Sequence, residues 1–115
     1  LLWKEWHLSS YLVDGNGRAH CGKRIKVHPG EEVFGGMVQT DASTNTWEVT
    51  STRLKTNETS KYSASLNDAK IDAAYLTVEG MIIYECSAYP SNEGINFYNN
   101  TLKSGDGSEL KPSWT

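Results

Sequence analysis

Apolar and polar positions alternate with a period of two residues along much of the chain, in short runs rich in Val, Ile, Thr, Tyr and Trp. This alternation is typical of β-strands that bury one face, and no segment has a good helical pattern. We expect strands at residues 2–8, 24–28, 32–40, 46–53, 60–66, 74–84 and 94–98. Seven short strands separated by turns predict an all-β fold in which antiparallel sheets pack as a β-sandwich.

Turn residues separate these runs. Gly, Pro, Asn, Asp and Ser collect in the stretches 14–17, 29–30, 41–45, 55–58, 91–94 and 105–107. Gly and Asn tolerate the positive φ angles of tight turns, and Pro fixes φ at a turn position. These stretches therefore set the expected ends of the strands.

Composition and charge narrow the classes of function. The chain has 115 residues, of which 37% are hydrophobic and 22% charged, so we expect one domain over residues 1–115. The net charge of −3 leaves no basic stripe to neutralise phosphates, and we expect no nucleic-acid partner. No apolar run approaches the roughly 20 residues needed to cross a bilayer, so we expect no membrane partner. The chain opens on the strand-like LLWKEW without an initiator Met, and we expect it to be one piece of a longer precursor.

Two cysteines and two sequons favour a secreted chain. Cys21 and Cys86 either form a disulfide or remain two buried thiols. A disulfide that closes so long a loop would stabilise the fold by roughly 4 kcal/mol in the chain-entropy model. Asn57 and Asn99 each begin an Asn-x-Thr glycosylation sequon in a turn-like stretch where a glycan would be exposed. Together these features predict an extracellular location.

The expected strand at 74–84 carries one acid, Glu79, among apolar residues. Alternation places Glu79 on the same face as Tyr75, Thr77 and Met81. Because both faces are partly apolar, the pattern fits a central strand whose second face lines a concavity for recognition or chemistry. A salt bridge from Glu79 to a neighbouring strand, or a place at a sheet edge, is the simpler explanation from the pattern alone.

The first expected strand combines aromatic and charged residues. Trp3, Glu5 and His7 share one face, and Lys4 and Trp6 share the other. A Trp ring packs on the apolar face of a sugar while a carboxylate accepts hydroxyl protons, so this pairing is common in sugar sites. A solvent-exposed strand with snorkelling side chains has the same pattern.

The alternation in residues 46–53 also assigns faces. Trp47 and Val49 are expected to pack in the core. Glu48, Thr50 and Thr52 fall on the opposite face and are expected to contact solvent.

No motif indicates a metal, a cofactor or a familiar catalytic group. His20 and Cys21 are adjacent and the other histidines are isolated, which is not the ligand spacing of a zinc site. The sequence has no Gly-x-Ser-x-Gly motif and no Gly-rich phosphate loop, and its Ser, His and Asp residues show no spacing typical of a triad. We expect neither a metal nor a cofactor.

Five stretches follow one another along the chain: WKEW, IKVHPGEEVFGGM, NTWEVTSTRLKTNETSKYSASL, AYLTVE and INFYN. Their order resembles the carboxyl-terminal part of the glutamic peptidase (eqolisin) family over most of the chain. Trp3, Glu5 and Trp6 match the family's W-x-E-W strand. Glu79 matches the final Glu of the family's AEWIVE strand, which the resemblance implies to be a catalytic acid, and Tyr75 replaces the first Glu of that motif.

The resemblance implies a concanavalin-like or jelly-roll double sandwich that another chain completes. In the family, a Gln on an earlier strand works with the Glu, so that the acid activates a water and the amide stabilises the oxyanion. That Gln lies upstream of the W-x-E-W strand, and Gln39, the only Gln here, lies in the wrong place for this role. We therefore expect a second polypeptide chain, in a heterodimer rather than a homodimer.

A closer resemblance is to uncharacterised peptidase-like sandwich proteins that share the PGEEVFGGM, CSAYP and PSWT stretches, and it implies no activity. The sequence thus predicts a secreted, non-catalytic chain that binds a glycan or a small apolar or aromatic ligand on a concave face. The expected ligand-binding residues are Trp3, Glu5, Tyr75, Thr77, Glu79 and Met81. The alternative is the heavy chain of an acid glutamic endopeptidase, with Glu79 as acid/base and a Gln from the partner chain.

Overall fold

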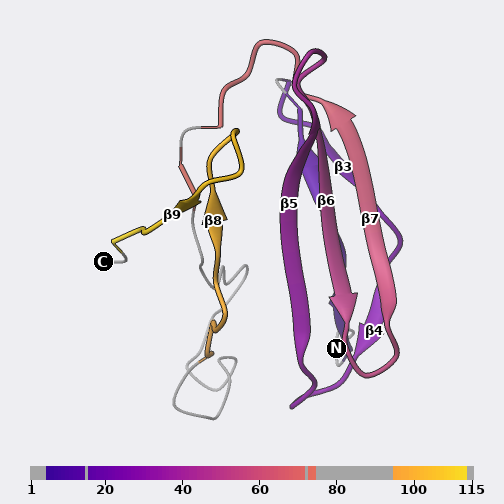
Figure 1. Cartoon of the computed structure of the whole chain (residues 1–115). Coiled ribbons are helices and arrows are strands. Elements are labelled where there is room, and N and C mark those ends of the chain that lie inside the picture. Colours follow the sequence, from indigo (N-terminus) through magenta and orange to yellow (C-terminus); the bar gives the residue numbers. More distant parts are fainter. Residues whose placement is uncertain (1–4, 15, 72, 75–94, 114–115) are drawn as a thin grey trace, which may run out of the picture. The chain divides into compact units, whose positions relative to one another are not determined.

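The computed structural model is all-β, and its strands pair antiparallel, as the alternation predicts. The structure describes residues 5–14, 16–71, 73–74 and 95–113, which belong to two compact units, 1–70 and 71–115 (Figure 1). The strands are β1 (Trp6–Leu8), β2 (Tyr11–Val13), β3 (Ala19–Cys21), β4 (Ile25–Val27), β5 (Val33–Asp41), β6 (Thr46–Arg53), β7 (Glu58–Ser65), β8 (Leu102–Lys103) and β9 (Glu109–Leu110). In this part of the chain there is no helix long and apolar enough to span a membrane.

The largest sheet of the first unit has the order β5-β6-β7 (Figure 1). Its register places Met37 opposite Val49, and Val49 opposite Tyr62, so these three side chains share one face. Tight turns at Asn45 (φ 49°) and Asn57 (φ 56°) join the strands, and Asn is the residue other than Gly that adopts a positive φ most readily. The expected strand 46–53 is confirmed with its bounds.

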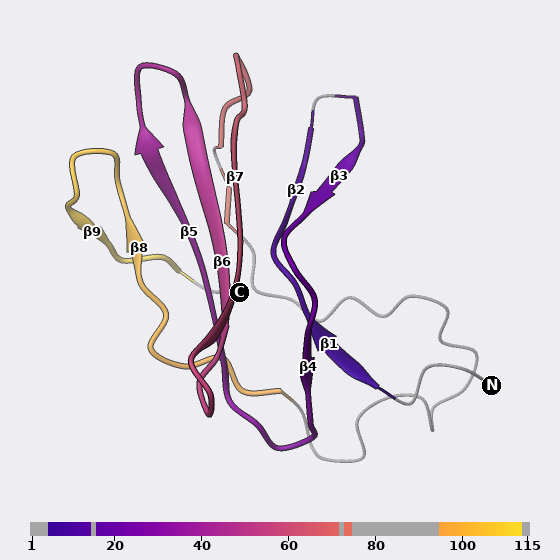
Figure 2. The same ribbon diagram turned by 90° about the vertical axis from the view of Figure 1, so that its right-hand side faces the viewer.

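Two short antiparallel pairs, β1-β4 and β2-β3, accompany this sheet in the first unit. The β2-β3 turn forms because Asp14 Oδ1 accepts hydrogen bonds from the N–H groups of Asn16 and Arg18, while Gly17 takes a φ of 77°. In Figure 2 these pairs lie on the β7 side of the sheet, where β2, β3 and β4 contact β7 and β1 contacts β6. The small apolar core contains Ile25, which is 1% exposed, and Leu12, which is 8% exposed.

Serine and glycine make the closest contact between the short pairs and the sheet. The N–H of Ser10 donates to Ser60 Oγ at 3.0 Å, and the Ser10 hydroxyl donates to Ser51 Oγ at 2.8 Å and to the Ser60 carbonyl at 3.1 Å. A Cβ atom at Gly22 would lie 2.6 Å from the Lys61 carbonyl oxygen, so only Gly fits there. We call the face of the sheet that carries Ser51 and Ser60 the inner face.

In the second unit, β8 and β9 form a short hairpin in which Leu102 lies opposite Leu110. Its turn is held by Asp106, whose Oδ1 accepts from the N–H of Ser108, and Gly107 has a φ of 86°. The turn at 105–107 was expected from its Gly-Asp-Gly sequence and is confirmed.

The structure differs from the expected strands in three places. β2, β3, β8 and β9 were not predicted, because two or three residues are too few to show an alternating pattern. The expected strand at 94–98 is wrong for residues 95–98, which do not form a strand and in which Ile95 and Phe97 are 51% and 46% exposed. Nearly all of the expected strand at 74–84 lies outside the described residues.

Candidate functional site

Of the ligand-binding residues expected from the sequence, the structure describes Glu5. The others, which lie outside the described residues, are Trp3, Tyr75, Thr77, Glu79 and Met81. Glu5 precedes β1, its side chain is 52% exposed, and its carboxylate accepts a hydrogen bond from Lys26 Nζ and lies 3.8 Å from His7 Nε2. The hydrogen bond from Lys26 lowers the pKa of Glu5. Within the described residues, Glu5 therefore forms an ion pair with Lys26 on the surface of the β1-β4 pair.

Three residues expected to carry a disulfide or a glycan are described by the structure, and all three are exposed: Cys21, Asn57 and Asn99. Cys21 ends β3 opposite Tyr11 as an exposed free thiol, and Cys86 lies outside the described residues, so their pairing stays a prediction. Asn57 and Asn99 are both exposed, each with a positive φ in a turn or loop. Occupancy of the two sequons likewise stays a prediction.

The site that the structure does build lies on the inner face of β5 and β6. The register puts Val33, Gly35, Met37 and Gln39 of β5 on this face beside Val49 and Trp47 of β6. We call these six residues the open strip. The short pairs contact β6 and β7, and in Figure 2 β5 is the strand of the sheet farthest from them. The inner face is therefore buried at Ser51 and Ser60 but accessible along β5.

Gly35 leaves open space in the middle of the apolar part of the open strip. A Cβ atom built at Gly35 meets no atom within 4 Å, whereas one at Gly36, on the other face, would lie 3.3 Å from the Phe34 ring. The flanking side chains are half exposed, with Val33 at 48% and Met37 at 44%. Because successive residues of a strand rise by about 3.4 Å, the apolar stretch from Val33 to Met37 is about 14 Å long.

A hydrogen-bonded network fixes one end of the open strip. Asn45 Oδ1 accepts from Trp47 Nε1 at 2.8 Å and from Gln39 Nε2 at 3.0 Å. The amide of Asn45 also donates to the carbonyls of Asn67 and Ala69, both at 2.8 Å. The indole of Trp47 is thereby held in one orientation on the sheet, which is what a preorganised aromatic platform needs.

An ion pair lies at the other end of the open strip. Arg53, opposite Val33, donates from Nε and Nη2 to the two carboxylate oxygens of Glu31 at 2.8 and 2.6 Å, and these side chains are only 15% and 10% exposed. The Arg53 hydrogen bonds, with one from the N–H of His28, lower the pKa of Glu31 to about 2. The carboxylate therefore stays ionised and serves as a fixed anchor for the start of β5.

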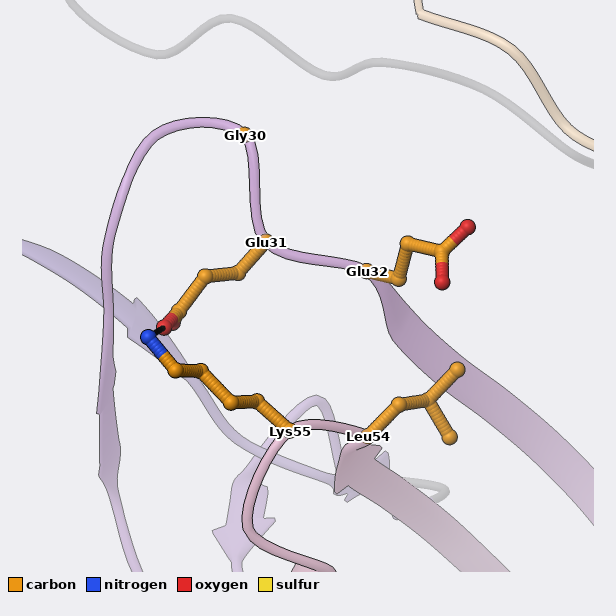
Figure 3. A pocket seen from close by; sticks show the side chains of 5 residues that line it. All are labelled: Gly30, Glu31, Glu32, Leu54 and Lys55. Atoms are coloured by element: carbon orange, nitrogen blue, oxygen red, sulfur yellow. Dashed lines mark ion pairs between the residues drawn. The ribbon is translucent and has the colours of Figure 1, made fainter.

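A shallow hollow lies beside this ion pair, lined by Gly30, Glu31, Glu32, Leu54 and Lys55 (Figure 3). Lys55 Nζ is 3.6 Å from Glu31 Oε1, and the Glu32 side chain points away from both (Figure 3). Glu31 is held by Arg53 and Lys55, so its carboxylate serves an ion pair in this hollow.

His20 and Asp14 form another close pair of titratable groups in the first unit. His20 Nε2 is 2.9 Å from Asp14 Oδ2, and the imidazole stacks on Tyr62 with ring centroids 5.8 Å apart. The hydrogen bond with His20 lowers the pKa of Asp14. Cys21 follows His20 on β3 and so points to the opposite face, away from this pair. The pair instead holds the β2-β3 hairpin to β7.

The described residues contain no group of three or more His, Cys, Asp or Glu side chains that could hold a metal ion. The arrangement they do contain is an accessible apolar strip with a fixed indole and an amide at one end. Such a surface can bind a flat apolar or amphipathic ligand. The signal in the sequence was the Gly35-Gly36 pair inside an expected strand, since Gly there removes a side chain from each face.

Comparisons with protein families, with curated proteins and with solved structures found no match to this chain. The resemblance to glutamic peptidases therefore remains a prediction from the order of the motifs.

Proposed function

We propose that this chain is a non-catalytic binding module whose open strip takes a small apolar or aromatic ligand, or the apolar face of a glycan. The observation that carries the proposal is the empty space over Gly35 between two half-exposed apolar side chains, Val33 and Met37. A planar ring seated there would replace water on both of them, and apolar burial contributes roughly 25 cal/mol for each Å² removed from water.

The polar end of the strip supports a ligand that also has hydroxyl groups. The Gln39 amide donates to Asn45 Oδ1, and its carbonyl oxygen lies at the same end of the strip as the Trp47 ring. A hydroxyl can donate to such an oxygen while the sugar ring packs on the indole. The sequence predicts a glycan site from a Trp and a carboxylate, whereas the proposed site combines Trp47 with the amide of Gln39.

The proposal includes a second polypeptide that extends the β-sandwich beside the open strip and completes the ligand pocket. The short pairs cover only the β6-β7 side of the inner face, which leaves room for such a partner next to β5. We also propose that the chain is extracellular, with glycans on Asn57 and Asn99 and a disulfide between Cys21 and Cys86. The exposed positions of Asn57 and Asn99 support the glycosylation part of the proposal.

The test is an NMR titration of the full chain with three probes: 4-nitrophenyl β-D-glucoside, methyl β-D-glucoside and indole. The resonance of the Trp47 indole N–H is the reporter, because that group lies at the end of the strip. We expect saturable shifts of Trp47 and of Met37 with the nitrophenyl glucoside, which has both a sugar and an aromatic ring. Absence of shifts in the open strip with all three probes would contradict the proposal.

Acid-dependent protease activity would support the endopeptidase alternative in place of this proposal. In that alternative Glu79 acts as acid/base with a Gln from the partner chain. Digestion of denatured haemoglobin at acid pH by material purified with its partner is the direct assay. Activity that Glu79→Gln abolishes and that Met37→Ala leaves unchanged would overturn the binding proposal.

A further inference from the structure

Asn45 is saturated with hydrogen bonds at the polar end of the open strip. Its side-chain N–H groups donate to the carbonyls of Asn67 and Ala69, both at 2.8 Å. Its Oδ1 accepts from Trp47 Nε1 at 2.8 Å and from Gln39 Nε2 at 3.0 Å. A side-chain amide has two N–H donors and an oxygen with two lone pairs, so this amide has no hydrogen-bonding group left for a ligand.

Three of the four partners of Asn45 have a fixed polarity. The backbone carbonyls of Asn67 and Ala69 can only accept a hydrogen bond, and the indole N–H of Trp47 can only donate one. Turning the Asn45 amide by half a rotation would set its oxygen against two carbonyl oxygens and its N–H groups against the indole N–H. The Asn45 oxygen therefore has to face Trp47 and Gln39, and Gln39 has to donate to it.

This arrangement decides what Gln39 offers to a ligand. Because Gln39 Nε2 is directed at Asn45 Oδ1, the Gln39 carbonyl oxygen is directed elsewhere, and no described residue donates a hydrogen bond to it. Gln39 lies opposite Trp47 in the register, and both are half buried. The Trp47 N–H is already used, so the indole offers a ligand only its ring face. Gln39 is left with one acceptor oxygen and one N–H.

A hydroxyl group suits these two functions of Gln39 better than an ether oxygen does. A hydroxyl can donate to the Gln39 oxygen and accept from the remaining N–H, whereas an ether oxygen can only accept. An ether seated there would remove water from the Gln39 oxygen without replacing its hydrogen bond, and an unsatisfied acceptor destabilises the complex. A site of this kind therefore discriminates against a ligand that lacks the donor.

We propose that the open strip selects rings that carry a hydroxyl or N–H donor over rings of the same size that have only acceptors, and that Asn45 is the positioning residue that sets this selectivity. Asn45 acts through its two neighbours. It holds the Gln39 amide with the oxygen free, and it occupies the Trp47 N–H that an acceptor ligand would otherwise use. This selectivity rests on the proposed function, since it requires a ring on the open strip, and it adds which polar group that ring carries.

The first test compares two isomers, 4-ethylphenol and 4-methylanisole, of which only the phenol has an O–H donor. Each is titrated into the full chain while the Trp47 indole N–H and the Met37 methyl group are followed by NMR. We expect 4-ethylphenol to bind about tenfold more tightly, the effect of leaving one acceptor unsatisfied. Equal affinities with shifts in the open strip would overturn the selectivity and leave the proposed function standing. Absence of these shifts with both isomers would contradict a ring on the open strip, and the proposed function would then fail as well.

A change at Gln39 tests the acceptor. Gln39→Met keeps an unbranched side chain and removes both the oxygen and the N–H groups. We expect the two isomers to bind this variant with nearly equal affinity. Val38→Thr, a change of similar size on the outer face next to Gln39, is the matched control and should keep the native affinity ratio. A native ratio in Gln39→Met would overturn the proposal.

Changes at Asn45 test the positioning role. Asn45→Gly tolerates the φ of 49° and releases the Gln39 amide and the Trp47 N–H together. An ether oxygen then finds a donor in the indole, so we expect the affinity ratio to fall by at least about threefold. Asn45→Asp keeps an acceptor for both neighbours and should keep the native ratio.

The affinity ratio separates positioning from a merely structural role of Asn45. A structural role would weaken the binding of both isomers equally, so an unchanged ratio in Asn45→Gly would overturn the proposal. A ratio that falls as far in Asn45→Asp as in Asn45→Gly would overturn it too. The native-chain and Gln39→Met measurements test the selectivity independently of whether Asn45→Gly folds.

Discussion

Ser10 and Ser60 lie fifty residues apart in the chain and satisfy each other's polar groups where the short strand pairs meet the sheet. The N–H of Ser10 donates to Ser60 Oγ at 3.0 Å, and the Ser10 hydroxyl donates to the Ser60 carbonyl at 3.1 Å. Ser60 is 0% exposed and Ser10 is 1% exposed. A polar contact thus holds the first unit together where an apolar core would be expected.

Replacing Ser60 by Ala should destabilise the first unit. The change leaves the buried N–H of Ser10 without its acceptor, and an unsatisfied buried donor costs about 1–3 kcal/mol. Urea unfolding of the full chain measures the loss. Ser63→Ala, on the exposed face of the same strand, is the matched control and should change the free energy of unfolding by less than about 0.5 kcal/mol. Equal effects of the two changes would contradict the role of the Ser10–Ser60 contact.

Gly22→Ala should also destabilise the fold. The new methyl group would lie 2.6 Å from the Lys61 carbonyl oxygen and 2.7 Å from Ser60 Oγ, and overpacking of this kind costs about 1–3 kcal/mol. Gly35→Ala is the control, because its methyl group meets no atom within 4 Å. In thermal unfolding, the Tm of Gly22→Ala should lie well below that of the native chain, and the Tm of Gly35→Ala should lie close to it. A loss of stability in Gly35→Ala as large as in Gly22→Ala would contradict the description of both positions.

The long strands were predictable because their sequences carry the alternating pattern over eight or nine residues. β6 was expected at 46–53 and lies there, and β5 and β7 were expected within two residues of their observed ends. The expected turns at 41–45, 55–58 and 105–107 were also correctly placed, and the one at 91–94 lies outside the described residues. The short strands and residues 95–98 were not, because pairing over two to four residues is decided by neighbours in space and not by local pattern.

The candidate site was less predictable than the strands. Trp47 and Val49 were expected in the core and are half buried, since the short pairs do not extend over β5. Nothing in the sequence separates the buried Ser51 and Ser60 from exposed serines, because their burial depends on Ser10, which comes from a distant part of the chain. The Gly35-Gly36 pair indicated missing side chains on β5, but only the fold shows that the space over Gly35 stays open.

Changes at Asn45 should separate backbone strain from the side-chain network. Asn45 has a φ of 49°, and its side chain bonds Gln39 and Trp47. The Asn45→Gly and Asn45→Ala variants both lose these hydrogen bonds. Only the Ala variant also has the cost of a positive φ, which destabilises an L-residue by about 1–2 kcal/mol. Urea unfolding should therefore show Asn45→Ala less stable than Asn45→Gly by about that amount. If the two variants are equally stable, the strained conformation of Asn45 is not supported.

The Glu31–Arg53 ion pair should make stability depend on pH in the acid range. The pKa of Glu31 falls from an ordinary 4.5 to about 2 in the folded chain, so folding favours the ionised carboxylate. Its stabilising contribution is complete above the unfolded pKa and is lost as the pH falls from about 5 to about 2. The difference in stability between the native chain and Glu31→Gln, followed by urea unfolding at several pH values, should shrink over that range. A difference that is constant from neutral pH to about pH 2 would contradict the lowered pKa.

The most direct test of the proposed binding function is the affinity of 4-nitrophenyl β-D-glucoside for two glycine variants. Gly35→Leu fills the space over the open strip, and Gly105→Leu places the same side chain at a second glycine that also has no atom within 4 Å of an added Cβ. Isothermal titration calorimetry should show at least a tenfold loss of affinity for Gly35→Leu and native affinity for Gly105→Leu. Native affinity in both variants would contradict the account, because the ligand would then not lie on the open strip.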